Sequence, residues 1–139
     1  MLTRTIYLAT FALIVLGCST SKEGGTEESI GSIKKRVMAV HDEVMPKMDD
    51  LYKIQKQLLK MADSLKSDSL IAAKYRELAD EIELANESMM DWMRKFEPNY
   101  EGTEEAIKAY LEDQEKSIIE VKERMINSLE AGRKELQRK

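Results

Sequence analysis

Apolar side chains recur at alternating three- and four-residue steps through the middle of this chain, and this spacing constrains the fold more than any other feature. The most regular run consists of Tyr75, Leu78, Ile82, Ala85, Met89, Trp92 and Phe96. This is the period of one face of an amphipathic helix and of a coiled-coil-like seam. No glycine lies between Ser32 and Glu101, so the many tight turns of an all-β protein are excluded. The sequence therefore predicts an all-α fold.

Similar apolar spacing occurs on both sides of this run, and polar segments separate the three parts. We predict helices over about 30–66, 69–97 and 103–136. Asp68 or Ser69 can cap the second helix, and Thr103 can cap the third. Because short connections force neighbouring helices to run antiparallel, the prediction is an up-down-up three-helix bundle over residues 30–139.

Three residues interrupt the helical pattern. Pro46 lies inside the first predicted helix and should kink it, because proline has no amide to donate to the carbonyl of Asp42. A helix that restarts at Pro46 is the alternative. Gln114 is a polar interruption in the apolar stripe of the third helix, and we expect that helix to fray after Gly132.

The N-terminus has the pattern of a secretory signal. Arg4 precedes an apolar run over residues 6–16 that is too short to span a bilayer and that ends at Gly17 and Cys18. Residues 15–18, Val-Leu-Gly-Cys, resemble the lipobox of bacterial lipoproteins, with valine in place of the usual leucine. The resemblance implies that 1–17 is a signal peptide and that Cys18, the one cysteine, receives acyl chains such as palmitate.

The segment after this cysteine is polar and rich in small residues. Residues 18–29 have the composition of a flexible tether. Acyl chains on Cys18 would hold the following domain at a membrane surface essentially permanently. We therefore expect a bundle that is tethered to a membrane.

The residues present exclude several kinds of site. With one histidine, His41, and no thiol besides Cys18, the chain cannot build a structural zinc site, a Cys-His nucleophile or a covalent haem site. No glycine-rich phosphate loop precedes a helix. A formal net charge of −4 disfavours nucleic acid as a partner. We expect a protein that is not an enzyme.

One cluster of sulfur and aromatic side chains could bind a ligand. It contains Met38, His41, Met45, Met48 and Tyr52 on the first helix and Met89, Met90, Trp92 and Met93 on the second. If the hairpin turns about residue 67, His41 lies level with Met93, and Met45 lies level with Met89.

Three interpretations of this cluster remain open. Because thioether and imidazole ligands select soft ions, His41, Met45, Met48, Met89 and Met93 could bind Cu(I) or Ag(I). Non-covalent haem, with the histidine and one methionine as axial ligands, is a second interpretation. The third is that flexible methionine side chains fill an irregular core beside the kink.

Two segments carry a resemblance to known sequences. Residues 41–48, His-Asp-Glu-Val-Met-Pro-Lys-Met, and residues 89–96, Met-Met-Asp-Trp-Met-Arg-Lys-Phe, resemble a group of short helical lipoproteins from Bacteroidetes-type bacteria. Some members are labelled viral A-type inclusion proteins, and the group has no assigned activity. The resemblance covers most of the chain after Cys18 and implies an outer-membrane anchor that faces the periplasm. Lys22 and Glu23 only partly match the group's signal for the cell surface, which stays open.

These observations lead to one expectation of function. We expect a membrane-anchored, non-enzymatic lipoprotein of the cell envelope that acts as a helical binding or scaffold module, with another envelope protein as its partner. The alternative is a periplasmic Cu(I)- or Ag(I)-binding protein.

Overall fold

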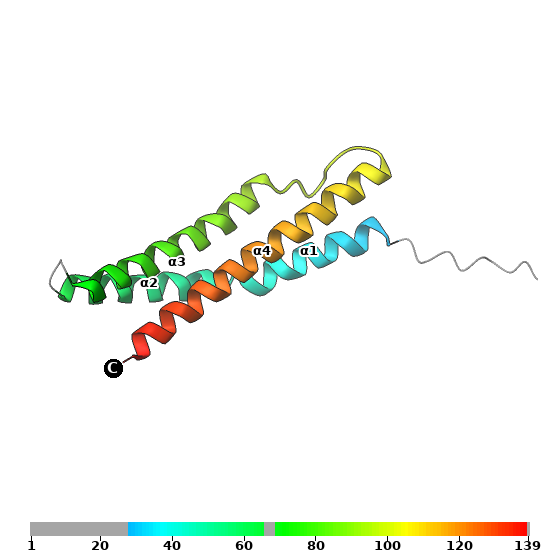
Figure 1. Ribbon diagram of the computed structural model, residues 1–139. Coiled ribbons are helices and arrows are strands. Elements are labelled where there is room, and N and C mark those ends of the chain that lie inside the picture. Colours follow the sequence, from blue (N-terminus) through cyan, green and yellow to red (C-terminus); the bar gives the residue numbers. More distant parts are fainter. Residues whose placement is uncertain (1–27, 66–68, 139) are drawn as a thin grey trace, which may run out of the picture.

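In the computed structural model, which describes residues 28–65 and 69–138, the chain is built from α-helices, and no strand occurs in these residues. The helices are α1 (Ile30–Val44), α2 (Lys47–Ser64), α3 (Leu70–Lys95) and α4 (Glu104–Gln137). Figure 1 shows α1 and α2 running in one direction, α3 returning antiparallel to them, and α4 reversing the direction again. The prediction of an all-helical bundle is confirmed. The predicted signal peptide, Cys18 and all of the tether before residue 28 lie outside the described residues.

Three helices begin at polar caps. The side chains of Ser29, Ser69 and Thr103 each accept a hydrogen bond from the backbone N–H three residues further on, at 3.2, 3.0 and 3.3 Å. Such caps satisfy one of the free amides at a helix start and are worth about 1 kcal/mol each. The caps predicted at Ser69 and Thr103 are confirmed.

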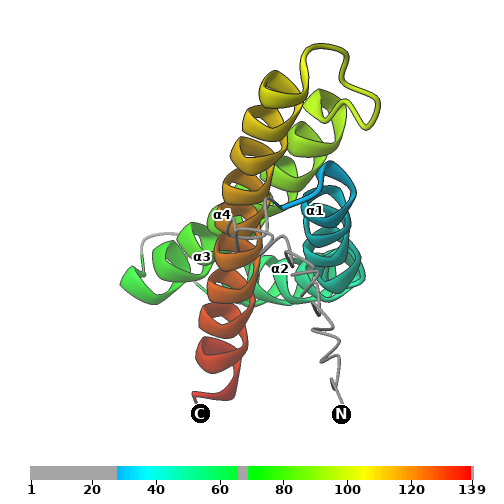
Figure 2. The ribbon, with the colours of Figure 1, turned by 90° about the vertical axis from the view of Figure 1, so that its right-hand side faces the viewer.

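The first predicted helix, 30–66, is interrupted rather than only kinked. α1 ends at Val44, and α2 begins at Lys47 with Pro46 in the N-cap position. Because Pro46 has no amide, the helical hydrogen-bond pattern breaks here, and the amide of Met48 instead donates to the carbonyl of Met45 at 3.2 Å. Figure 2 shows α1 and α2 meeting at an angle at this point. The restart at Pro46, first considered as an alternative, is the better description.

This break changes which helices are neighbours. α2 packs along α3, whereas α1 packs chiefly along α4. Gln55 Nε2 donates to the carbonyl of Ala79 at 3.3 Å, which is the register expected for a hairpin that turns about residue 67. The core that these contacts enclose contains Val37, Val44, Leu51, Leu58, Ala62, Tyr75, Ala79, Ile82, Ala85, Met89, Trp92, Ile118, Val121, Met125 and Leu129.

The C-terminal part of α4 is packed into the bundle, so the expected fraying after Gly132 is wrong. α4 continues to Gln137, and Gly132 itself is buried. A Cβ atom at this position would lie 2.6 Å from Ile54 Cγ2 and 3.1 Å from Ile82 Cδ1. Beyond it, Leu136 packs against the core. The glycine therefore allows α4 to approach α2 and α3 closely, and this close packing outweighs its low helix propensity.

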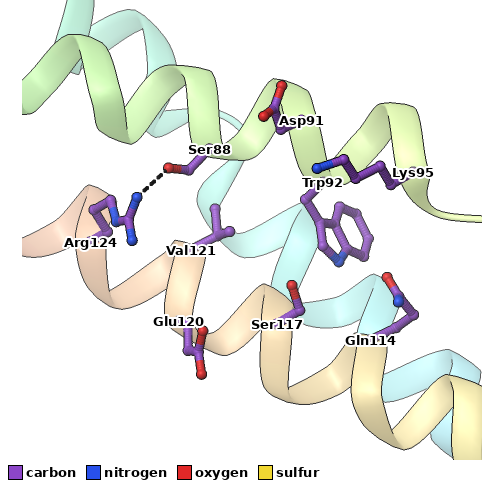
Figure 3. A pocket seen from close by; sticks show the side chains of 9 residues that line it. All are labelled: Ser88, Asp91, Trp92, Lys95, Gln114, Ser117, Glu120, Val121 and Arg124. Atoms are coloured by element: carbon purple, nitrogen blue, oxygen red, sulfur yellow. Dashed lines mark hydrogen bonds between the residues drawn. The ribbon is translucent and has the colours of Figure 1, made fainter.

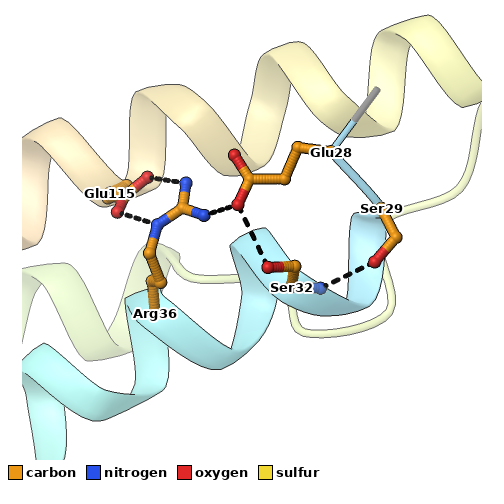
Figure 4. A network of polar contacts seen from close by, with 5 residues as sticks. All are labelled: Glu28, Ser29, Ser32, Arg36 and Glu115. Atoms are coloured by element: carbon orange, nitrogen blue, oxygen red, sulfur yellow. Dashed lines mark hydrogen bonds and ion pairs between the residues drawn. The ribbon is translucent and has the colours of Figure 1, made fainter. Parts of the chain in front are cut away.

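A polar network fixes the start of α1 to α4 (Figure 4). The Arg36 guanidinium donates to both carboxylate oxygens of Glu115, from Nε at 2.6 Å and from Nη2 at 2.7 Å, and it also pairs with Glu28. Ser32 Oγ donates to Glu28 at 3.0 Å. The hydrogen bonds from Arg36 hold the pKa of the Glu115 carboxyl below its usual range. The N-terminal part of α1 is thus held against α4 by hydrogen bonds and ion pairs.

Within the described part of the chain, no helix has the length and apolar character needed to cross a membrane.

Candidate functional site

The structure brings His41 of α1 and Met93 of α3 together beside the Pro46 break. His41 Nε2 lies 3.4 Å from Met93 Sδ, and His41 Nδ1 lies 2.9 Å from Asp42 Oδ1. The tautomer with the proton on Nδ1 donates to the Asp42 carboxylate, and in that tautomer Nε2 presents a lone pair to the sulfur. Since a thioether has no proton to donate, the contact then joins two electron-pair donors.

The other predicted ligands are divided between the core and the surface. Met89 is fully buried, and Met48 is half-buried against the core. Met45 is 36% exposed and lines an open hollow of about 600 Å³ together with Asp42 and Pro46. Residues 28–65 and 69–138 contain no group of three or more His, Cys, Asp or Glu side chains that could hold a metal ion. The structure therefore places the predicted pair of His41 and Met93 in contact and leaves Met45 on the outside.

A ladder of aromatic rings extends from this pair to the loop between α3 and α4. The centroid distances are 5.7 Å from His41 to Trp92, 4.8 Å from Trp92 to Phe96, 6.4 Å from Phe96 to Tyr110 and 4.3 Å from Tyr110 to Tyr100. Tyr110 also accepts a hydrogen bond from the amide that follows Phe96, at 2.6 Å. Stacked rings at these separations stabilise one another by about 0.5–1.5 kcal/mol per pair. The ladder holds the Trp92 indole in a fixed orientation.

Trp92 also forms one wall of a cleft of about 300 Å³ between α3 and α4 (Figure 3). The remaining residues that line this cleft are Ser88, Asp91, Lys95, Gln114, Ser117, Glu120, Val121 and Arg124. Apart from Trp92 and Val121, all of these side chains are polar or charged. The volume is at the lower end of the range for small-molecule sites, which is about 300–1,000 Å³.

The indole N–H of Trp92 has no hydrogen-bond acceptor at this cleft. Its side chain is only 5% exposed, and Nε1 is buried with no hydrogen-bond partner in the described residues. Figure 3 shows this nitrogen directed towards α4, where Ser117 and Gln114 lie. A buried donor without a partner costs about 1–3 kcal/mol, and buried indole N–H groups usually have an acceptor.

The charges of the cleft are arranged unevenly. Arg124 Nη1 donates to Ser88 Oγ at 2.7 Å, and within the described residues neither Arg124 nor Lys95 pairs with a carboxylate. Asp91 pairs with Arg94 outside the cleft. In Figure 3, Asp91 and Glu120 point away from the space between the helices. The cleft therefore has two cations and two carboxylates in its lining, with the carboxylates turned outward and the indole N–H buried in its wall.

Only one feature of the sequence indicates this cleft. Gln114 interrupts an apolar stripe, and the structure places it beside the Trp92 indole. Lys95, Ser117 and Arg124 could not be identified, because on a helix that is 34 residues long and rich in charge they look like any solvated residue.

Comparison with known protein families, with curated proteins and with solved structures finds no match.

Proposed function

We propose that this chain is a lipid-anchored, non-enzymatic binding module of the bacterial cell envelope. The proposal places acyl chains on Cys18, uses the residues from 18 to 27 as a tether, since Glu28 and Ser29 are already bonded to α1, and lets the bundle hold a partner protein at the membrane surface. The resemblance to short lipoproteins supports an outer-membrane anchor that faces the periplasm. The hydrogen bonds from Arg36 to Glu115 attach the start of α1 to α4, which supports a bundle that stays folded up to the point where the tether begins.

The observation that carries this proposal is the apolar surface around the turn between α2 and α3. We define the hairpin tip as Leu59, Met61, Leu70 and Ile71. All four are exposed, Leu70 at 89% and Ile71 at 57%. Figure 1 shows the end of α2 and the start of α3 at the end of the bundle opposite to the start of α1. We infer that these side chains form a docking surface, because contiguous exposed apolar groups mark interaction sites, and Leu70 and Ile71 line one hollow together.

The charges beside the hairpin tip indicate the chemistry of the partner. A hollow of about 400 Å³ there is lined by Leu70, Ile71, Lys74, Tyr75, Glu135 and Arg138. Glu135 pairs with Lys74 at 2.7 Å and with Arg138 at 3.5 Å, so one carboxylate lies between two cations and the hollow keeps one positive charge. Exposed apolar side chains with one positive charge beside them suit the apolar face of an amphipathic helix in an envelope protein.

Photo-crosslinking in intact cells tests this proposal. A photoreactive amino acid replaces Ile71 in the hairpin tip or, as a matched control, Ile119 on α4, which is 39% exposed and outside the tip. We expect a discrete adduct with one envelope protein from position 71, its loss when Leu70→Glu is added, and no such adduct from position 119. Identical products from both positions, or no protein adduct from position 71, would contradict a docking surface at the tip.

The contact between His41 and Met93 favours one second candidate, a Cu(I) or Ag(I) site. For bonds as long as those of zinc to nitrogen and sulfur, about 2.0 and 2.3 Å, a separation of 3.4 Å corresponds to an angle of roughly 105° at the metal, and the longer bonds of Ag(I) would make this angle smaller. The hydrogen bond from His41 Nδ1 to Asp42 orients the ring in the manner usual for metal-binding histidines. The indole of Trp92 lies beside the same ring, with centroids 5.7 Å apart and the planes tilted by 31°, and could cover a bound cation.

Silver binding to the Cys18→Ser chain tests this candidate without competition from a thiol. An ion that binds only the folded chain should raise its free energy of unfolding by about 2.7 kcal/mol at a hundredfold excess over Kd. His41→Ala and Met93→Leu should each remove this gain. Met61→Leu, a matched change at an exposed methionine, should preserve it. An unchanged melting temperature in the presence of silver would exclude the site.

A further inference from the structure

The cleft between α3 and α4 combines three features that the packing of the bundle does not explain. A buried indole N–H faces it without a partner, a glutamine interrupts the apolar stripe beside that indole, and an arginine in it makes no ion pair among the described residues. Elsewhere on the same helix an arginine is paired, since Arg133 donates to Asp50 at 2.7 Å. Arg124 is exposed and donates only to Ser88, so the indole N–H of Trp92 is the one donor of this cleft that is buried without an acceptor among the described residues.

The positions of these donors indicate what the acceptor is. Arg124 is held by Ser88, whose hydroxyl donates in turn to the carbonyl of Leu84 at 2.7 Å, so the guanidinium is oriented at one end of the cleft. A guanidinium presents two parallel N–H groups that match a carboxylate. Trp92 and Lys95 lie towards the other end, with Val121 between the two ends (Figure 3). Two polar ends and an apolar middle match a short chain that carries an acid group at each end.

We propose that this cleft binds a small dicarboxylate. One carboxylate pairs with Arg124, and the second accepts hydrogen bonds from Trp92 Nε1 and from Gln114, with Lys95 nearby as a counter-charge. A small shift of the Gln114 or Ser117 side chain opens the path to the indole nitrogen. The site uses no residue of the hairpin tip, so its test is independent of the test of the proposed partner surface.

The fluorescence of Trp92 reports directly on this site, because it is the only tryptophan in the chain. The mature protein, purified in detergent, is titrated with succinate at constant ionic strength, and acetate and inorganic phosphate serve as comparison anions. We expect a saturable change in emission with succinate and at least a tenfold weaker response to acetate and to phosphate. A parallel rise in melting temperature with succinate should confirm that the anion binds the folded state.

Three variants connect this signal to the cleft. Arg124→Gln should abolish the response, Gln114→Leu should weaken succinate binding at least tenfold, and Arg133→Gln, the matched arginine control, should leave it unchanged. Circular dichroism establishes that each variant is folded. The inference is overturned if succinate gives no saturable response in the parent protein, if phosphate or acetate acts equally well, or if Arg124→Gln retains the response.

Discussion

Gly132→Val should destabilise the bundle by about 3 kcal/mol and lower its melting temperature by at least about 10 °C. The reason is steric, since even a Cβ atom at this position would lie 2.6 Å from Ile54 Cγ2 and 3.1 Å from Ile82 Cδ1. Because the three helices are locked together here, either α4 or both neighbouring side chains must move. Valine has a better helix propensity than glycine by only a few tenths of a kcal/mol, which is too little to compensate.

Two controls separate this steric effect from helix propensity. Gly31→Val makes the same change near the start of α1, where a new Cβ has no neighbour within 4 Å, and it should alter stability by less than about 0.5 kcal/mol. Ile54→Ala removes the closest methyl group, so Gly132→Ala should cost less in that background than in the parent protein. Thermal unfolding of these proteins measures all three effects. Equal effects of valine at positions 31 and 132 would mean that α4 does not approach its neighbours as described.

The helical fold and its register could be predicted because both depend on spacing. A three- and four-residue apolar period defines a helix face wherever it occurs, and a short turn fixes which residues face each other. Contacts from His41 to Met93 and from Gln55 to Ala79 follow that register. The prediction that the last helix frays after Gly132 failed because spacing along one helix does not show how the helices pack. The low helix propensity of this glycine is a local property, whereas the space it leaves for Ile54 and Ile82 belongs to the assembled bundle.

The candidate site could be predicted only in part. Helical steps placed Met45 with the other methionines, but the break at Pro46 redirects α1 along α4, and Met45 remains exposed. A proline within an apolar period predicts a break and a kink equally well. The packing of α1 against α4 instead of α3 could therefore not be predicted from the sequence. The cleft at Trp92 depends on which charged side chains of α3 and α4 lie opposite one another. The apolar period of a helix does not predict these pairs.

Cys18→Ser should move the protein from the membrane fraction to the soluble fraction almost completely. Cys18 is the only cysteine and directly follows the apolar run, so no other residue can receive the acyl chains. One acyl chain gives only reversible membrane binding, whereas two or more anchor a protein stably. Ser19→Ala, a matched change one residue later, should leave the protein in the membrane fraction.

The central claim is that the bundle works from a lipid anchor, and the intact mass of the membrane-bound protein tests it most directly. We predict a chain that begins at Cys18, lacks residues 1–17 and carries the added mass of its acyl groups. A membrane-bound chain that still begins at Met1 and carries no acyl mass would contradict the account.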